Sequence, residues 1–126
     1  MAKILIVDDS PTEMHILRTT LLKYGHSIVT ATSGEESLEV ARAERPDLIL
    51  MDVVMPGMNG FQATRKLSLD PEMKSVPVIV VSNKSQETDR IWGIRQGAKD
   101  YLVKPVSEAT LIESVRKVLG ARSGGT

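Results

Sequence analysis

Short apolar runs alternate along this chain with longer stretches in which apolar residues recur at helical spacing. Short runs rich in Val and Ile are typical of strands that are buried on both faces of a sheet. The longer stretches have the period of helices that bury one side. We therefore expect five strands, over residues 4–7, 27–31, 48–51, 77–81 and 101–103.

The stretches between the strands carry the start and stop signals of helices. They begin at Ser10, Ser33, Asn59, Ser85 and Ser107, and a Glu three residues after each of the first two serines forms a capping box. They end at Gly25, before Pro46, near Asp70-Pro71, at Gly97 and at Gly120. The first helix is expected to bury Met14, Leu17, Leu21 and Leu22 on one face.

Strict alternation of strand and helix predicts right-handed crossovers and a parallel sheet covered on both faces. We expect an α/β fold, a flavodoxin-like (βα)5 doubly wound sandwich with strand order 2-1-3-4-5. With 126 residues, the chain is long enough for one core. We expect a single domain over residues 1–126, with its core at about 3–120 and a frayed tail over 121–126.

Composition and charge exclude several function classes. Lys+Arg and Asp+Glu both number 16, and aromatic residues make up 3%, so neither a basic surface nor stacking rings favour nucleic-acid binding. There are no cysteines for disulfides or thiolate sites. The apolar run that opens the chain is too short for a signal or membrane segment. We expect a soluble, cytosolic monomer.

Five polar residues follow the ends of four expected strands. Asp8 and Asp9 follow the first strand, Asp52 the third, Ser82 the fourth and Lys104 the fifth. In the expected strand order these side chains meet in one crevice. Three carboxylates repel one another unless a cation is present, and hard oxygen ligands suit Mg²⁺. With a lysine and a hydroxyl beside them, Asp52 is a candidate nucleophile that accepts a phosphoryl group.

Each of these residues also has a structural interpretation, and two other functions compete. The aspartates and the serine are common at turns and caps, and most lysines are surface residues. An aspartate-dependent phosphohydrolase of the haloacid-dehalogenase kind needs a second carboxylate two residues after Asp52, where Val54 stands. An FMN carrier of the flavodoxin type needs a phosphate-binding loop where Asp8 and Asp9 would repel the ligand.

The chain resembles the response-regulator receiver family, whose single-domain type is the chemotaxis regulator CheY. The resemblance extends from residue 4 to about residue 119. The matching segments are Ile4–Ser10, Leu50–Asp52, Met55–Gly60, Val80–Ser82 and Gly97–Pro105. Ser10–Met14 and Gly60–Arg65 also look similar to stand-alone regulators of type IV pilus twitching systems. A receiver cut from a longer transcriptional regulator is the alternative.

The resemblance implies roles for individual residues. Asp52 would be the phosphoacceptor, and Asp8, Asp9, Asp52 and the carbonyl of Val54 would hold Mg²⁺. Ser82 would be the switch hydroxyl, Tyr101 the aromatic ring that turns inward with it, and Lys104 the phosphate partner, with a cis bond to Pro105.

The resemblance also implies partners for the chain. A histidine kinase or phosphotransfer domain would supply the phosphoryl group, and a target protein would bind the face made by helix four, strand five and helix five. One position departs from the family's pattern. Asn83 stands where a small residue is usual, and Lys84 follows it, so access to Asp52 and the lifetime of the phosphate are in question.

Overall fold

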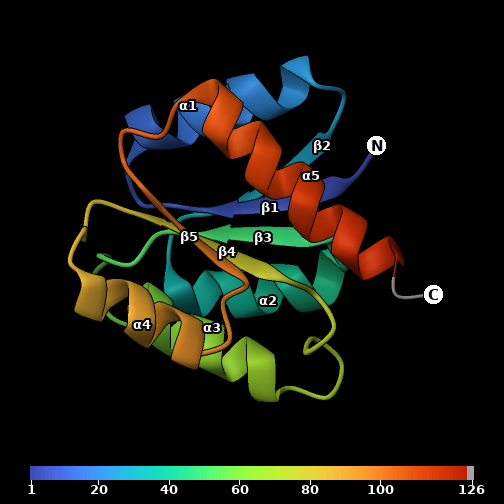
Figure 1. Cartoon of the computed structure of the whole chain (residues 1–126). Coiled ribbons are helices and arrows are strands. Elements are labelled where there is room, and N and C mark those ends of the chain that lie inside the picture. The colour runs from blue at the N-terminus through green and yellow to red at the C-terminus, as the bar shows by residue number, and fades with distance from the viewer. Residues whose placement is uncertain (125–126) are drawn as a thin grey trace.

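The structure, a computed structural model, describes residues 1–124, apart from the side chains of residues 122–124. Strands and helices alternate throughout, as the apolar pattern predicts (Figure 1). The elements are β1 (Lys3–Val7), α1 (Pro11–Lys23), β2 (Ser27–Ala31), α2 (Gly34–Glu44), β3 (Leu48–Met51), α3 (Gly60–Leu69), β4 (Val78–Ser82), α4 (Glu87–Arg95), β5 (Asp100–Val103) and α5 (Glu108–Gly124).

The five strands form one parallel sheet in the order β2-β1-β3-β4-β5, which confirms the expected doubly wound fold. The chain reverses its direction of winding between β1 and β3, which pair from Ile4 with Leu48 to Val7 with Met51. The residues after these two strands therefore lie side by side at one edge of the sheet. This is the place where open α/β sheets bind ligands.

Helices α1 and α5 cover one face of the sheet, and α2, α3 and α4 lie on the other (Figure 1). Successive strand residues point to opposite faces, so each central strand contributes to both halves of the core. Ile4 and Ile6 of β1 pack in the cluster that contains the buried leucines of α1, whereas Leu5 and Val7 pack in the cluster that contains Ala41 and Leu67. This two-sided burial holds the strand ends, and hence the site, in fixed register.

Three expectations about the helices are wrong, one each in α1, α4 and α5. Leu22 is 44% exposed, because α1 buries only Leu17 and Leu21 and keeps Met14 partly buried. The N-cap of α4 is Gln86 instead of Ser85, and Asp89 accepts a hydrogen bond from the Gln86 N–H at 3.2 Å.

Helix α5 does not end at Gly120 but continues to Gly124, since one helical glycine costs only about 1 kcal/mol. The expected frayed tail is therefore helical through residue 124, and its last two residues lie outside the described residues. In residues 1–124, no helix combines the length and the apolar character that crossing a membrane requires.

Candidate functional site

The three aspartates predicted at the strand ends come together in the structure. The backbone of Asp8 continues β1 by donating to Ala31, and the Asp52 N–H donates to the Val7 carbonyl at 2.9 Å. One carboxylate oxygen from each of Asp8, Asp9 and Asp52 lies within 4.8 Å of the other two. Asp8 and Asp52 are buried, and Asp9 is exposed at the mouth of the site. The arrangement offers a cluster of hard oxygen ligands that could hold a metal ion.

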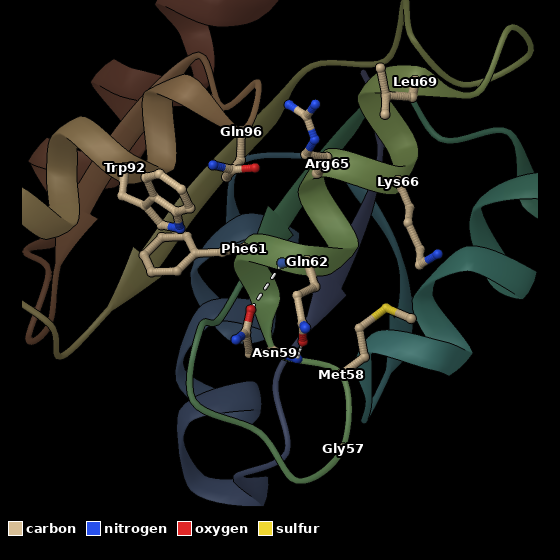
Figure 2. A pocket seen from close by; sticks show the side chains of 10 residues that line it. All are labelled: Gly57, Met58, Asn59, Phe61, Gln62, Arg65, Lys66, Leu69, Trp92 and Gln96. Atoms are coloured by element: carbon tan, nitrogen blue, oxygen red, sulfur yellow. Dashed lines mark hydrogen bonds between the residues drawn. The ribbon is translucent and has the colours of Figure 1, made fainter.

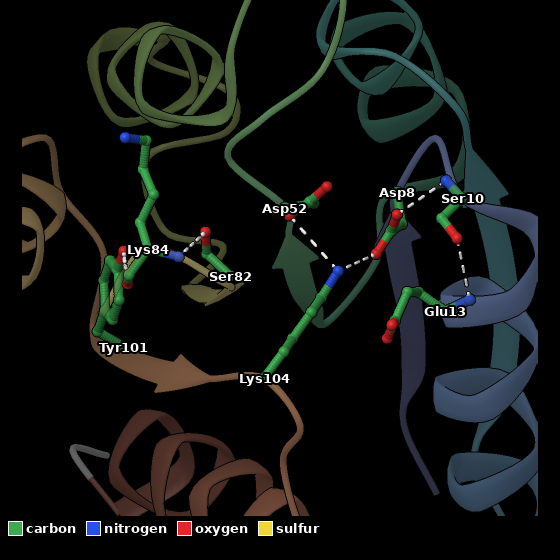
Figure 3. Close-up of polar contacts among 8 residues, drawn as sticks. All are labelled: Asp8, Ser10, Glu13, Asp52, Ser82, Lys84, Tyr101 and Lys104. Carbon is green, nitrogen blue, oxygen red and sulfur yellow. Dashed lines mark hydrogen bonds and ion pairs between the residues drawn. The ribbon is translucent and has the colours of Figure 1, made fainter. Parts of the chain in front are cut away.

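Lys104 reaches from the end of β5 into this cluster and lies between two of the carboxylates (Figure 3). Its Nζ is 2.8 Å from Asp8 Oδ2 and 3.5 Å from Asp52 Oδ1. Burial by itself would lower the pKa of Lys104, but the hydrogen bond to Asp8 and the charges of both carboxylates outweigh it and raise the pKa. The ammonium therefore stays charged and supplies one positive charge to the cluster. The peptide bond from Lys104 to Pro105 is cis.

The carboxyl group of Asp52 has a strongly shifted pKa. Burial, followed by the negative charge of Asp8, raises the pKa of Asp52 to about 6. Lys104 and the Val53 N–H work in the opposite direction and offset only part of this rise. A single ammonium thus leaves excess negative charge in the crevice, and a further cation would lower the free energy of the ionised site.

Ser82 and Tyr101 are both tied to the backbone of Lys84 (Figure 3). The buried Ser82 hydroxyl accepts a hydrogen bond from the Lys84 N–H at 3.1 Å, and the Tyr101 hydroxyl donates to the Lys84 carbonyl at 2.8 Å. Burial raises the pKa of the Tyr101 hydroxyl, which stays protonated as a donor. Tyr101 is only 3% exposed, so its ring is already inside in this structure.

The loop after β3 carries Val54, whose side chain is 61% exposed. Two features that the sequence pattern does not predict hold this loop in place. Glu35 at the start of α2 accepts a hydrogen bond from the Met58 N–H at 3.0 Å, and this bond lowers the pKa of Glu35. A Cβ at Gly60 would overlap the carbonyl oxygen of Asp52, so only glycine lets α3 begin this close to the site.

The position of Gly60 just after the Met-Pro-Gly turn was the only sequence signal for this close approach. The Glu35 contact joins residues 23 positions apart and has no sequence signal of its own.

Asn83 and Lys84, the residues that depart from the expected pattern, are exposed beside Ser82. A cavity of about 340 Å³ adjoins Asp8 and Asp9 and is lined from α1 by Pro11 and Met14, among others.

Known proteins resemble this chain over nearly its whole length. The family described as "Response regulator receiver domain" matches residues 4–116. The chain belongs to this family. It is 57% identical to Protein PilH of Pseudomonas aeruginosa over 119 residues, which cover 94% of this chain and 98% of PilH. It is 38% identical to the response regulator PleD of Caulobacter vibrioides, but there it spans only 26% of the relative's length.

Solved receiver structures share the fold closely. The chemotaxis protein CheY4 of Vibrio cholerae has a TM-score of 0.88 at 33% identity, with 94% of this chain and 98% of that chain covered. The receiver domain of a Pseudomonas aeruginosa sensor histidine kinase has a TM-score of 0.87 at 28% identity over the same shares of the two chains. That structure has a magnesium ion coordinated in its active site cleft.

Membership of the receiver family implies a histidine kinase as partner. It also implies a signalling module instead of an enzyme, apart from the chemistry of the module's own phosphorylation. The chain is thus similar in sequence to PilH and in fold to CheY-like receivers.

Proposed function

We propose that the chain is a cytosolic phosphorylation switch in which Asp52 accepts a phosphoryl group from a histidine kinase or a phosphotransfer domain. The observation that carries the proposal is the placement of Asp52 beside Asp8, Asp9 and Lys104 in one crevice. The 57% identity to PilH, of which the match covers 98%, supports a regulator of the type IV pilus twitching kind.

In the proposed reaction, an Asp52 carboxylate oxygen attacks the phosphorus of the donor. A new O–P bond forms, and the bond from phosphorus to the donor's leaving group breaks with its electron pair on that group. Lys104 lies within 3.5 Å of Asp52 and can pair with the phosphoryl oxygens once they arrive. Ser82, which now accepts from the Lys84 N–H, has a hydroxyl that can turn and donate to the same oxygens.

The oxygen cluster fits Mg²⁺, because its donors are carboxylates and burial together with Asp8 already raises the pKa of Asp52. Asp8, Asp9, Asp52 and the carbonyl of Val54 would hold the ion. When bound, Mg²⁺ neutralises charge on the transferring phosphoryl group. The chain's own residues orient Asp52 and supply the Lys104 charge.

The proposed output is a change at the Lys84 backbone. If Ser82 turns to the phosphoryl group, the Lys84 N–H loses its acceptor, and Tyr101 is joined to the same residue through its hydroxyl. Helix α4, β5 and α5 would then present a different face to a target protein. A phosphohydrolase is not favoured, since the position for its general acid holds the exposed apolar side chain of Val54.

The test uses beryllofluoride, the reagent that activates the receiver domain of Klebsiella pneumoniae RstA. Trp92 is the only tryptophan of the chain and lies on α4, so its fluorescence reports on that helix. With Mg²⁺ present, beryllofluoride should change the emission of the wild type and leave Asp52→Asn unchanged. Ser82→Ala should respond more weakly. An equal response in Ser82→Ala would show that the switch does not run through this hydroxyl.

A further inference from the structure

A groove between α3 and α4 lies apart from the phosphoacceptor site and from the proposed α4-β5-α5 face. It encloses about 730 Å³, within the range of protein sites that bind ligands. Phe61 forms its buried base, and Trp92 of α4 and Leu69 of α3 line it (Figure 2). Trp92 thus lies on the flank of α4 that meets α3.

Two apolar side chains of this groove, those of Trp92 and Leu69, are unusually exposed. Trp92 is 50% exposed and Leu69 66% exposed, although both are large apolar residues. Exposed apolar patches in a soluble domain mark binding surfaces, and tryptophan and arginine are the residues most enriched at the centres of interfaces. The described residues cover only about half of Trp92 and a third of Leu69.

The charged residues that line the groove all have one sign. Arg65 and Lys66 project from α3, and the remaining polar lining consists of amide side chains such as Gln62 and Gln96. Figure 2 shows both cationic side chains on α3, with Lys66 on the side of that helix that faces away from Trp92. No salt bridge with a described carboxylate engages either cation. In a chain with no net charge, this local excess of positive charge selects an acidic partner.

We propose that the α3-α4 groove is a docking site for an acidic amphipathic segment of a partner protein. Its apolar anchors would lie between Trp92, Phe61 and Leu69, and its carboxylates would pair with Arg65 and Lys66. The geometry is that of a helix laid in a groove between two helices, with apolar residues recurring at helical spacing. The groove is not lined by the three aspartates of the crevice, so binding of a partner to it can be tested in protein that is not phosphorylated.

The test is a selection of random peptides, about 15 residues or about four helical turns long, on the full chain. The enriched peptides should be rich in Asp and Glu around apolar anchors, and each should change the fluorescence of Trp92 on binding. In the double variant Arg65→Glu/Lys66→Glu, their affinity should fall by about tenfold or more. A peptide whose acidic residues are replaced by lysine should recover binding to that variant.

The matched control is the double variant Lys99→Glu/Lys117→Glu, which makes the same change of charge at exposed lysines elsewhere on the molecule. It should bind the selected peptides as the wild type does. Peptides that are not acidic, peptides unaffected by Arg65→Glu/Lys66→Glu, or no enrichment at all would overturn the proposal. So would sedimentation showing a dimer that this variant abolishes, because a second copy of the chain would then occupy the groove.

Discussion

Asp52 combines two demands that oppose each other. As the proposed phosphoacceptor, Asp52 must be ionised to attack, yet its carboxyl group lies in a buried crevice next to Asp8. Lys104 shares its single charge between the two carboxylates at 2.8 and 3.5 Å. The result is a pKa of about 6, which leaves Asp52 largely ionised at neutral pH at a cost in stability.

This cost in stability should disappear when the Asp52 carboxylate is replaced by an amide. In EDTA at pH 7, Asp52→Asn should be more stable than the wild type by about 1–3 kcal/mol, because the variant removes a carboxylate that is destabilised in the folded state. The pKa is raised on folding, so the wild type loses stability as pH rises from about 4 through about 6. The difference between the two proteins should therefore shrink as the pH falls toward 4.

Urea unfolding at several pH values measures this difference, with Asp9→Asn as the control. Asp9 is exposed, so solvent screens its charge and its replacement should raise stability by less. A pH-independent difference would mean that folding does not raise the pKa of Asp52, and a loss of stability in Asp52→Asn would mean that Asp52 serves as a structural cap. The residues of this site could be foreseen from the strand ends, whereas the bridging position of Lys104 depends on side-chain packing.

Helix α4 is largely exposed, and Gly93 is its one buried residue. A Cβ at Gly93 would stand 2.9 Å from the Tyr101 ring and 3.3 Å from the Phe61 ring. The absence of a side chain therefore lets α4 lie directly on both rings. The closeness of this contact makes α4 sensitive to any displacement of Tyr101.

Alanine substitutions at two helical glycines separate the effect of packing on stability from the effect of helix propensity. Gly93→Ala should destabilise the fold by about 1–3 kcal/mol through overpacking, although alanine favours helix. Gly120→Ala in α5 should stabilise it by about 0.5–1 kcal/mol, because a Cβ there meets no atom within 4 Å. Thermal unfolding of both variants checks the pair. A stabilising Gly93→Ala would show that α4 is not held against Tyr101.

The elements of this fold were largely predictable, because their apolar periods and capping residues agree with one another. The errors fall where tertiary packing decides. Leu22 has the helical spacing of a buried residue, but α1 is covered on only one narrow side. Helix α4 likewise leaves Ile91 and Ile94 exposed, since Gly93 is its residue that contacts the core. Sequence spacing alone cannot reveal which face an adjacent helix leaves open.

A small apolar cluster connects the proposed phosphoacceptor site with the rest of the molecule. It contains Val53, next to Asp52, together with Val80, Tyr101 and Phe61. Phe61 is also the base of the α3-α4 groove, and the Tyr101 hydroxyl reaches the Lys84 carbonyl beside Ser82. Packed contacts therefore run from the carboxylates to both flanks of α4, which gives the switch a physical route to a binding surface.

Metal binding should stabilise the whole molecule by mass action. At Mg²⁺ about a hundredfold above its dissociation constant, the free energy of unfolding should rise by about 2.7 kcal/mol. Differential scanning calorimetry with and without Mg²⁺ measures the shift. Asp9→Ala should lose most of it, and Glu39→Ala, which removes an exposed carboxylate on α2, should keep it. Equal shifts in all three proteins would rule out this metal site.

The central claim is that Asp52 itself carries the phosphoryl group. The most direct measurement treats the protein with phosphoramidate and Mg²⁺, reduces the product with borohydride, and maps the modified peptide by mass spectrometry. An acyl phosphate on Asp52 would be reduced to homoserine at position 52, and EDTA should prevent the reaction. Modification at Asp8 or Asp9, or an unmodified Asp52 in fully folded protein, would contradict the account.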